Sequence, residues 1–318
     1  MRGPGGLPVY TRLIDNIERV ILGKRRAIET VVVALLSRGH VLVEDLPGVG
    51  KTMLARALAL SIRGQYHRVQ CTPDLLPSDI TGVSTWDPKD LCFRFRSGPV
   101  FTNVLLVDEV NRATPRTQSA FLEAMEERQV TVDGTSQGLP RPFFLIATQN
   151  PIEMAGTFPL PEAQLDRFLV RTAIGYPDDA AELDILRAQR ETHPIRDLQP
   201  VMDLEHLMVT QDAVRRLFIH ESILRYVQQI VAETRRHPHA TFGASPRGAL
   251  ALMRAAQSLA AIRRGNFVTP DHVKELAPAV LAHRIQVKPQ SRVQGIDGHR
   301  VVEEVLRKVE VPVDFRPS

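Results

Sequence analysis

The fold of this chain is decided by the stretch Val41-Leu42-Val43-Glu44-Asp45-Leu46-Pro47-Gly48-Val49-Gly50-Lys51-Thr52. An apolar run that predicts a strand leads into a glycine-containing turn, and Lys51 and Thr52 open a helix that continues through Leu58. Glycines in such a turn let backbone N–H groups point at phosphate oxygens, and the helix start adds the positive end of its dipole. The stretch therefore predicts a phosphate-binding loop.

The side chains of this loop are suited to ATP with Mg²⁺, which we expect as the cofactors. Lys51 can reach the β- and γ-phosphates, and the hydroxyl of Thr52 can ligate Mg²⁺. The usual pattern has a glycine where Asp45 stands, but the glycines close to the lysine remain. A chance Gly-Lys-Thr turn is the alternative, and the flanking strand and helix count against it. The residues expected to contact the nucleotide here are Pro47, Gly48, Val49, Gly50, Lys51, Thr52 and Met53.

Two further apolar runs end in polar side chains that could serve the same site. Val104–Asp108 predicts a buried strand, whose Asp108 would hold Mg²⁺ directly or through water. Glu109 would be the base that polarises the attacking water. Phe143–Thr148 predicts another strand, after which the amide of Asn150 could orient that water. The alternatives are a helix N-cap for the acidic pair and a turn-capping role for Asn150.

The pattern of the chain changes at about Tyr176. Before it, short β-rich runs alternate with helical stretches, which is typical of an α/β fold with a parallel sheet. We expect a nucleotide-binding core over 1–176, a linker over 177–200 and an all-helical domain with a C-terminal tail over 201–318. The predicted strands are His40–Glu44, Tyr66–Gln70, Val104–Asp108 and Phe143–Thr148. The predicted helices are Ala180–Arg190, Gln211–Arg236, Pro246–Arg263 and Thr269–Arg284, followed by a polar linker at Val287–Arg300 and a last short helix.

Two segments of alternating apolar and polar residues interrupt the first part. They lie near 86–97 and 129–141, and each is predicted to be an inserted β-hairpin. Each hairpin could be an ordinary sheet edge, or it could protrude and touch a substrate or a neighbouring subunit.

Composition is that of an ordinary globular protein. Of 318 residues, 43% are hydrophobic and 24% are charged, and the net charge of +4 permits nucleic-acid contact without arguing for it. No apolar run is long enough to span a bilayer, and no secretory signal stands at the N-terminus, so a cytoplasmic location is expected. The two cysteines, Cys71 and Cys92, are expected to be small core side chains.

The motifs taken together resemble the MoxR family of AAA+ ATPases, over nearly the whole chain from Tyr10 to about Ala282. This resemblance implies a three-layer αβα P-loop core followed by a helical lid, with the hairpins as the helix-2 and pre-sensor-1 inserts. The runs that carry it, besides the phosphate-binding loop, are 72–82, Gly98-Pro99-Val100-Phe101, Asp108-Glu109-Val110-Asn111-Arg112-Ala113, 121–127 and 160–168.

The resemblance also implies roles for single residues. Lys51 and Thr52 match Walker A, Asp108 and Glu109 match Walker B, and Asn150 matches sensor 1. Arg167 matches the arginine finger that reaches the ATP of a neighbouring subunit, and Arg247 matches sensor 2. The adenine would lie under Ile21, Leu22 and Gly23.

The two arginines have plainer interpretations. Arg167 could form a surface salt bridge with Asp166 or Glu162, and Arg171, one helical turn further on, is the fallback finger. Arg247 could be a surface arginine near a helix start, although the helix dipole disfavours a cation there unless an anion compensates.

The resemblance implies an ATPase that forms a ring, most simply a hexamer, and remodels or matures a protein client. Its partners would include proteins with von Willebrand A domains, and a metal-chelatase motor is a variant of this class. Two rivals are a nucleic-acid motor, for which Lys89, Arg94 and Arg96 supply some charge, and a nucleotide-dependent switch that scarcely turns over.

Overall fold

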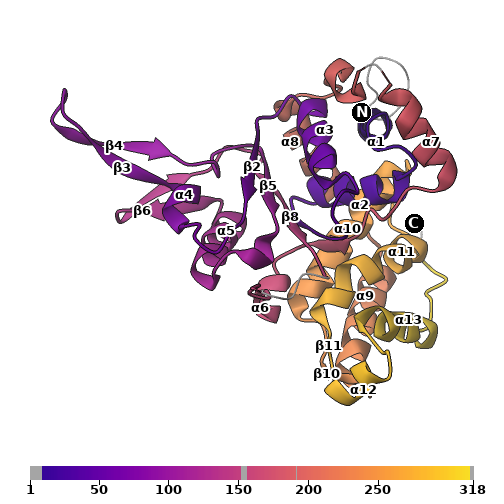
Figure 1. Cartoon of the computed structure of the whole chain (residues 1–318). Helices are drawn as coiled ribbons and strands as arrows, with labels where there is room; N and C mark the ends of the chain where they lie inside the picture. Colours follow the sequence, from indigo (N-terminus) through magenta and orange to yellow (C-terminus); the bar gives the residue numbers. More distant parts are fainter. Residues whose placement is uncertain (1–8, 152–155, 191, 316–318) are drawn as a thin grey trace.

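A five-stranded sheet lies at the centre of the computed structural model, which describes residues 9–151, 156–190 and 192–315 (Figure 1). Its strands stand in the order β2-β5-β8-β1-β9, and every neighbouring pair is parallel. Four strands match the predicted ones within a residue or two, whereas β9, three residues long, was not predicted. The strands are β1 (Val41–Glu44), β2 (Tyr66–Gln70), β5 (Val104–Asp108), β8 (Phe144–Gln149) and β9 (Val170–Thr172).

Helices cover both faces of the sheet. Successive side chains of a strand point to opposite faces, and the core divides accordingly. Val43 and Leu106 pack with α1 (Val9–Glu18), α2 (Arg25–Leu36) and α3 (Lys51–Ser61). Their neighbours Leu42 and Leu105 pack instead with α5 (Pro115–Glu127). The predicted three-layer αβα core is confirmed.

The two edges of the sheet differ in what they carry. The strands are parallel, so the phosphate-binding loop after β1, Glu109 after β5 and Asn150 after β8 all lie at the carboxyl edge. The opposite, amino edge is marked by His40, which precedes β1. Its Nε2 lies 3.1 Å from the carbonyl of Met125 near the end of α5, and its own carbonyl accepts a hydrogen bond from Leu169. The end of α5 and the start of β9 therefore lie at the amino edge.

Antiparallel pairs occupy the two segments predicted as hairpins. The first pairs β3 (Gly82–Asp87) with β4 (Cys92–Ser97), and it follows the short helix α4 (Pro77–Thr81). It extends away from the sheet, as Figure 1 shows at the left. The second pairs β6 (Gln129–Val132) with β7 (Thr135–Gly138).

Of the two cysteines predicted to lie in the core, one does and one does not. Cys71 is buried, and burial raises the pKa of its thiol to about 12. Cys92 is exposed, because it lies in a two-stranded hairpin rather than in the core.

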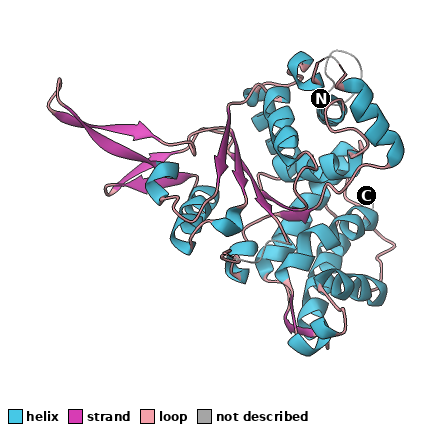
Figure 2. Cartoon of the chain, viewed as in Figure 1, coloured by secondary structure: helices cyan, strands magenta, loops and turns pink. Residues whose placement is uncertain are grey.

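The chain after residue 176 is mainly helical, as Figure 2 shows. Most of the helices predicted for this part are present in outline, and the structure adds one small two-stranded sheet, β10 (Ala240–Phe242) with β11 (Gln286–Val287). The α-helices are α7 (Asp179–Ala188), α8 (Leu204–Arg215), α9 (Glu221–Arg236), α10 (Pro246–Ile262), α11 (Pro270–Leu281), α12 (Pro289–Val293) and α13 (Gly298–Lys308), with 3-10 turns η2 (Pro194–Asp197) and η3 (Ala282–Arg284).

Two predictions for this part were wrong. The single helix expected over Gln211–Arg236 is broken between α8 and α9. At the break, the side-chain amide of Gln257 in α10 donates hydrogen bonds to the carbonyls of Arg215 and Leu217. The polar linker expected at Val287–Arg300 contains the end of β11 and all of α12. Val287 is buried there, which ties the segment to the body of the lid.

The lid and the core share one hydrophobic cluster. Leu252, Ala255 and Leu259 of α10 belong to the same buried cluster as Val31 and Leu35 of α2. Among the described residues, no helix is long and apolar enough to cross a membrane.

Candidate nucleotide-binding site

The phosphate-binding loop has the backbone that a phosphate group requires. Gly48 and Gly50 have φ values of +85° and +95°, in the region that favours glycine, and α3 begins at Lys51. Among the described residues other than its chain neighbours, none has an atom within 4 Å of the position that a Cβ on Gly48 would take, so this side of the loop is open to them. Ile21 closes another side, 3.6 Å from the corresponding position at Gly50. The loop thus fits a phosphate group at the N-terminus of α3.

Lys51 folds back onto its own loop. Its Nζ donates a hydrogen bond of 2.8 Å to the carbonyl of Asp45. This contact holds the ammonium group at the loop, from where it can exchange the carbonyl for a phosphate oxygen.

Asp45 takes a structural position in the loop. Its side chain is buried, and Oδ2 accepts hydrogen bonds of 2.6 and 2.7 Å from the backbone N–H groups of Ile174 and Gly175. Its Oδ1 accepts a third from Leu46, at 2.8 Å. The carboxylate therefore ties the loop to the chain that leaves β9, which a glycine could not do.

Asp108 is held at the end of β5 by two partners. Thr148 donates to its Oδ1 at 2.5 Å, and Arg68 of β2 forms an ion pair with its Oδ2 at 2.7 Å. The described residues contain no group of three or more acidic, histidine or cysteine side chains that could hold a metal. Mg²⁺ does not need one, since it is commonly bound by one or two protein ligands together with phosphates and water. Thr52 and Asp108 fit that pattern.

Glu109 lies in a constrained conformation beside them. Its φ is +55°, which is uncommon for any residue but glycine. Its Oε2 accepts hydrogen bonds from Gln70 at 2.9 Å and from Arg112 at 3.0 Å. Sequence reasoning missed both donors, although the end of a neighbouring parallel strand was a signal that could have indicated Gln70.

Asn150 follows β8 directly and is buried, with 8% of its surface exposed. Since β8 lies between β5 and β1, its carboxyl end stands between Glu109 and the phosphate-binding loop. The structure thus brings five of the predicted residues to one edge of the sheet: Lys51, Thr52, Asp108, Glu109 and Asn150.

The residues predicted to cover the adenine flank this edge. Ile21 contacts the loop, as described, and Gly23 lines a cavity of about 540 Å³ together with Ala173 and Ile174. Leu22 is half-buried between them. The described residues around this cavity include none from Pro47 to Met53, so the cavity adjoins the loop without containing it.

Arg167 and Arg247 lie together, but at the amino edge. Glu126, in the last turn of α5, forms an ion pair of 3.0 Å with Arg167 and one of 2.5 Å with Arg247. Arg167 also donates to the carbonyl of Leu122 at 3.2 Å. The carboxylate that pairs with Arg167 is thus Glu126, rather than Asp166 or Glu162 as in the plainer interpretation.

A cavity of about 440 Å³ adjoins these two arginines, and we call it the basic cavity. Two carboxylates, Glu126 and Asp166, are the acidic groups of its wall. Its arginines are Arg38, Arg128, Arg167, Arg247, Arg254 and Arg284.

Arg171 does not lie where the sequence predicted it. The helix α6 (Glu162–Leu165) ends before Arg167, so Arg171 is not one helical turn further on. It lies in β9 and forms an ion pair of 3.2 Å with Glu44 at the end of β1. This pairing inside the sheet removes it as a fallback finger.

Comparison with known proteins gives two matching family models. The model of the ATPase family associated with various cellular activities matches residues 40–170, and an AAA lid domain matches residues 232–305.

Several relatives match over nearly the whole chain. The uncharacterised protein YeaC of Bacillus subtilis is 49% identical, over 96% of both chains. Chaperone MoxR1 of Mycobacterium tuberculosis is 38% identical over 95% of this chain and 82% of its own. Protein MoxR of Methylorubrum extorquens is 31% identical over 94% and 92%. A crystal structure from Cytophaga hutchinsonii, of a protein provisionally assigned as an ATPase, superposes with a TM-score of 0.89 at 34% identity, over 95% and 96% of the two chains.

Proposed function

This chain belongs to the MoxR family of AAA+ ATPases, and we propose that it hydrolyses ATP between the subunits of a homo-oligomeric ring, most simply a hexamer. The turnover would drive remodelling or maturation of a protein client. In this proposal residues 1–176 form the nucleotide-binding core, 177–200 the linker and 201–318 the lid. A cytoplasmic location is part of it, because ATP is available there.

The observation that carries the proposal is the placement of Arg167 and Arg247 at the amino edge of the sheet. The phosphate-binding loop lies beyond the other end of β1, and a strand of four residues spans about 13 Å. The two arginines therefore lie at the opposite end of the sheet from the loop of their own subunit. In a ring they would meet the nucleotide of the neighbour, where a guanidinium can stabilise charge on the transferring phosphoryl group.

The residues at the carboxyl edge would carry out the hydrolysis. Lys51 and the N-terminus of α3 bind the phosphates, and Asn150 orients the attacking water. Thr52 and Asp108 would hold Mg²⁺, which when bound neutralises charge on the phosphates. Glu109 accepts the proton of the water.

Two side chains hold the carboxylate of Glu109. Both hydrogen bonds to its Oε2 come from charged or amide donors, Arg112 and Gln70, and these donors compete with a water for that oxygen. The arrangement supports a resting state with little hydrolysis, relieved when Gln70 releases the carboxylate.

The hairpin of β3 and β4 favours a protein over a nucleic acid as the target. Trp86 and Phe93 are exposed and pack edge to face, with ring centroids 5.3 Å apart. Arg94, which would supply charge for DNA, forms ion pairs with Asp87 and Asp90. An exposed aromatic pair beside an arginine that is already paired suits a protein client or a von Willebrand A domain partner.

The test is the steady-state ATPase rate against protein concentration for wild type, Glu109→Gln, Arg167→Ala and an equal mixture of the two variants. We expect a wild-type rate that rises with concentration and two variants with rates lower by about 10³-fold. In the mixture, about one interface in four pairs an intact base with an intact finger, so about a quarter of the wild-type rate should return. Arg187→Ala, at an exposed arginine of α7 paired with Asp184, is the matched control and should behave as wild type.

Other outcomes would favour the rival functions. An ATPase rate per subunit that does not change with protein concentration, together with a wild-type rate in Arg167→Ala, would contradict a site shared between subunits. A slow ATPase rate that Glu109→Gln does not change would indicate a nucleotide-dependent switch. Strong stimulation by DNA that falls steeply with salt would indicate a nucleic-acid motor.

A further inference from the structure

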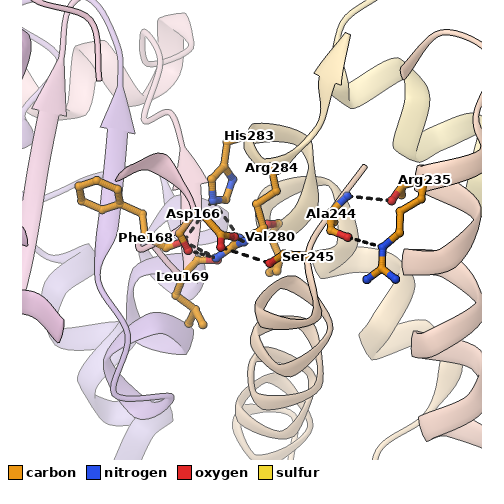
Figure 3. Close-up of polar contacts among 10 residues, drawn as sticks. Asp166, Phe168, Leu169, Arg235, Ala244, Ser245, Val280, His283 and Arg284 are labelled. Carbon is orange, nitrogen blue, oxygen red and sulfur yellow. Dashed lines mark hydrogen bonds and ion pairs between the residues drawn. The ribbon is translucent and has the colours of Figure 1, made fainter. Parts of the chain in front are cut away.

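Arg284 is buried at the contact between lid and core, with 2% of its side-chain surface exposed. It belongs to η3, directly after α11. Its guanidinium donates across the contact to Oδ1 of Asp166 at 2.8 Å and to the carbonyl of Phe168 at 2.6 Å (Figure 3). It also donates to the carbonyls of Asp166, Leu169 and Val280.

Two more lid residues hold the same short segment. Ser245, which precedes α10, donates to Oδ2 of Asp166 at 3.2 Å. His283 lies with its Nε2 3.1 Å from the carbonyl of Phe168. Burial and the neighbouring charge of Arg284 lower the pKa of His283, so the ring is neutral, and the same Nε2 also lies 2.9 Å from Nη1 of Arg284. Residues 166, 168 and 169 are therefore all fixed by the lid.

The segment that the lid holds is the one that carries Arg167. Its two neighbours in sequence, Asp166 and Phe168, receive hydrogen bonds from Arg284. The side chain of Arg167 shares Glu126 with Arg247, which is itself a lid residue. Neither its backbone nor its guanidinium can move far unless the lid moves with it.

Stability alone does not explain so polar a contact. Removing an arginine and a carboxylate from water costs about as much as their attraction returns, so a buried pair adds little net stability. Burial lowers the pKa of Arg284 to about 10, with Asp166 opposing that change, so the group keeps its charge at neutral pH. What five directional donors do supply is a fixed geometry for the carbonyls that they meet.

We propose that Arg284 is a positioning residue that couples the lid to Arg167, so that a lid displacement in one subunit moves its finger in the site of the neighbour. The assignment rests on the proposed function, since it requires Arg167 to act in a neighbouring site. Arg284 itself touches no nucleotide in this arrangement. Its effect on hydrolysis is therefore confined to the subunit that donates the finger.

The experiment uses that asymmetry in mixtures of full-length variants. In the mixture of Glu109→Gln and Arg167→Ala, only the Glu109→Gln subunit donates a finger. Arg284→Lys keeps the charge opposite Asp166 but loses the fork of donors. When Arg284→Lys is added to the Glu109→Gln subunit, which donates the finger, the recovered kcat should fall about tenfold or more, with the KM for ATP unchanged. Placed in the Arg167→Ala subunit, it should change nothing.

Two further variants sharpen the result. Asp166→Asn removes the ion pair with Arg284 from the core side. It should lower the recovered kcat in the same way, and only when it is added to the Glu109→Gln subunit. Arg300→Lys is the matched control, because this lid arginine is paired with Glu304 inside α13, and it should have no effect in either subunit.

The outcomes separate the positioning role from a structural one and from the proposed function. A loss of equal size in both subunits, as a folding defect would give, or no loss in either, would overturn the role of Arg284 alone. Absence of recovery in the unmodified mixture would overturn the proposed function and this assignment with it.

Discussion

Asp45 shows how one side chain can replace the usual glycine of a phosphate-binding loop without closing the loop. Its carboxylate points away from the phosphate side, into the backbone N–H groups of Ile174 and Gly175. These two donors follow β9 and are partly or fully buried, so they need an acceptor. The side chain that departs from the pattern is thus part of how the loop is held.

Restoring the glycine should therefore harm the protein. Asp45→Gly leaves two backbone donors without an acceptor, and we expect a loss of about 1–3 kcal/mol in the free energy of unfolding. Urea denaturation would measure it. Asp178→Gly, which removes an exposed helix cap at α7, is a useful comparison because it should cost only a few tenths of a kcal/mol. An Asp45→Gly protein as stable as wild type would contradict this account.

His40 is a buried histidine whose ring is satisfied only when neutral. Its Nδ1 accepts from the N–H of Leu145 at 3.0 Å, while Nε2–H donates to the carbonyl of Met125. Protonation of the ring would place a proton on Nδ1, which then could no longer accept the hydrogen bond from the N–H of Leu145. Burial accordingly lowers the pKa of His40 to about 4.

This shift makes the stability depend on pH in a defined window. Between about pH 6.5 and pH 4 the unfolded chain binds a proton at this residue that the folded chain does not bind. Stability should therefore fall as the pH is lowered through this window, by up to about 3 kcal/mol. Urea denaturation at a series of pH values should show this slope, and His40→Gln should reduce it, leaving the part that His283 and His272 contribute, because burial also lowers the pKa of these two rings. His67→Gln, at an exposed histidine of β2, should leave the slope unchanged.

At the residue scale, the sequence predicts the chemistry of the carboxyl edge but not the contacts that restrain it. Residue type and position after a strand are enough to indicate Lys51, Asp108 and Glu109. The donors Gln70 and Arg68 reach them from β2, nearly forty residues away, and only the strand order brings them close. Glu126 was missed for the same reason, since nothing in its helix points to a pair of arginines.

At the scale of elements, the backbone is closely packed at the base of the β3–β4 hairpin. A Cβ on Gly98 would lie 2.2 Å from the carbonyl oxygen of Ile80 and 2.6 Å from the nitrogen of Gly82. Real Cβ atoms do not approach backbone so closely. The absence of a side chain at Gly82 and Gly98 therefore lets the two backbone segments at the base of the hairpin pack directly against each other.

A pair of alanine substitutions tests this packing. Gly98→Ala must displace backbone, and we expect a loss of about 2 kcal/mol or more in the free energy of unfolding. Gly138→Ala lies in the other hairpin, where the described part of the chain, apart from its sequence neighbours, has no atom within 4 Å of the new Cβ, and it should change the stability by less than about 0.5 kcal/mol. Thermal unfolding of the two proteins side by side would decide the matter, and equal losses would contradict this packing.

Periodicity predicts long elements well and cannot place short ones. It predicts β2 and β5 to the residue and α10 to within one. It misses β9, because three residues carry no detectable alternation, and it joins α8 to α9 across Leu217–Ile219. That break depends on Gln257 and on Val268, whose N–H donates to the carbonyl of Phe218. Both are distant in sequence.

At the scale of the whole molecule, charge is unevenly placed. The net charge is only +4, yet the wall of the basic cavity has six arginines and two carboxylates. A neighbouring subunit that presents only neutral surface would leave this excess unbalanced. One that presents a bound nucleotide would neutralise it.

Assembly should therefore depend on nucleotide and on salt. We expect Glu109→Gln, which retains ATP, to associate at about a tenfold lower protein concentration with ATP than without it. Higher ionic strength should reduce the difference. Analytical ultracentrifugation would measure both effects. In Arg167→Ala/Arg247→Ala the dependence on ATP should disappear, and its persistence would show that the basic cavity does not face the nucleotide.

The hairpin of β3 and β4 also equips the protein with a spectroscopic probe. Trp86 is the only tryptophan of the chain, and half of its surface is exposed on an arm that extends from the sheet. The tryptophan emission of the unlabelled protein, excited separately from that of the four tyrosines, thus reports on this arm. A shift of its emission to shorter wavelength, followed in real time, would record the moment at which the arm is covered.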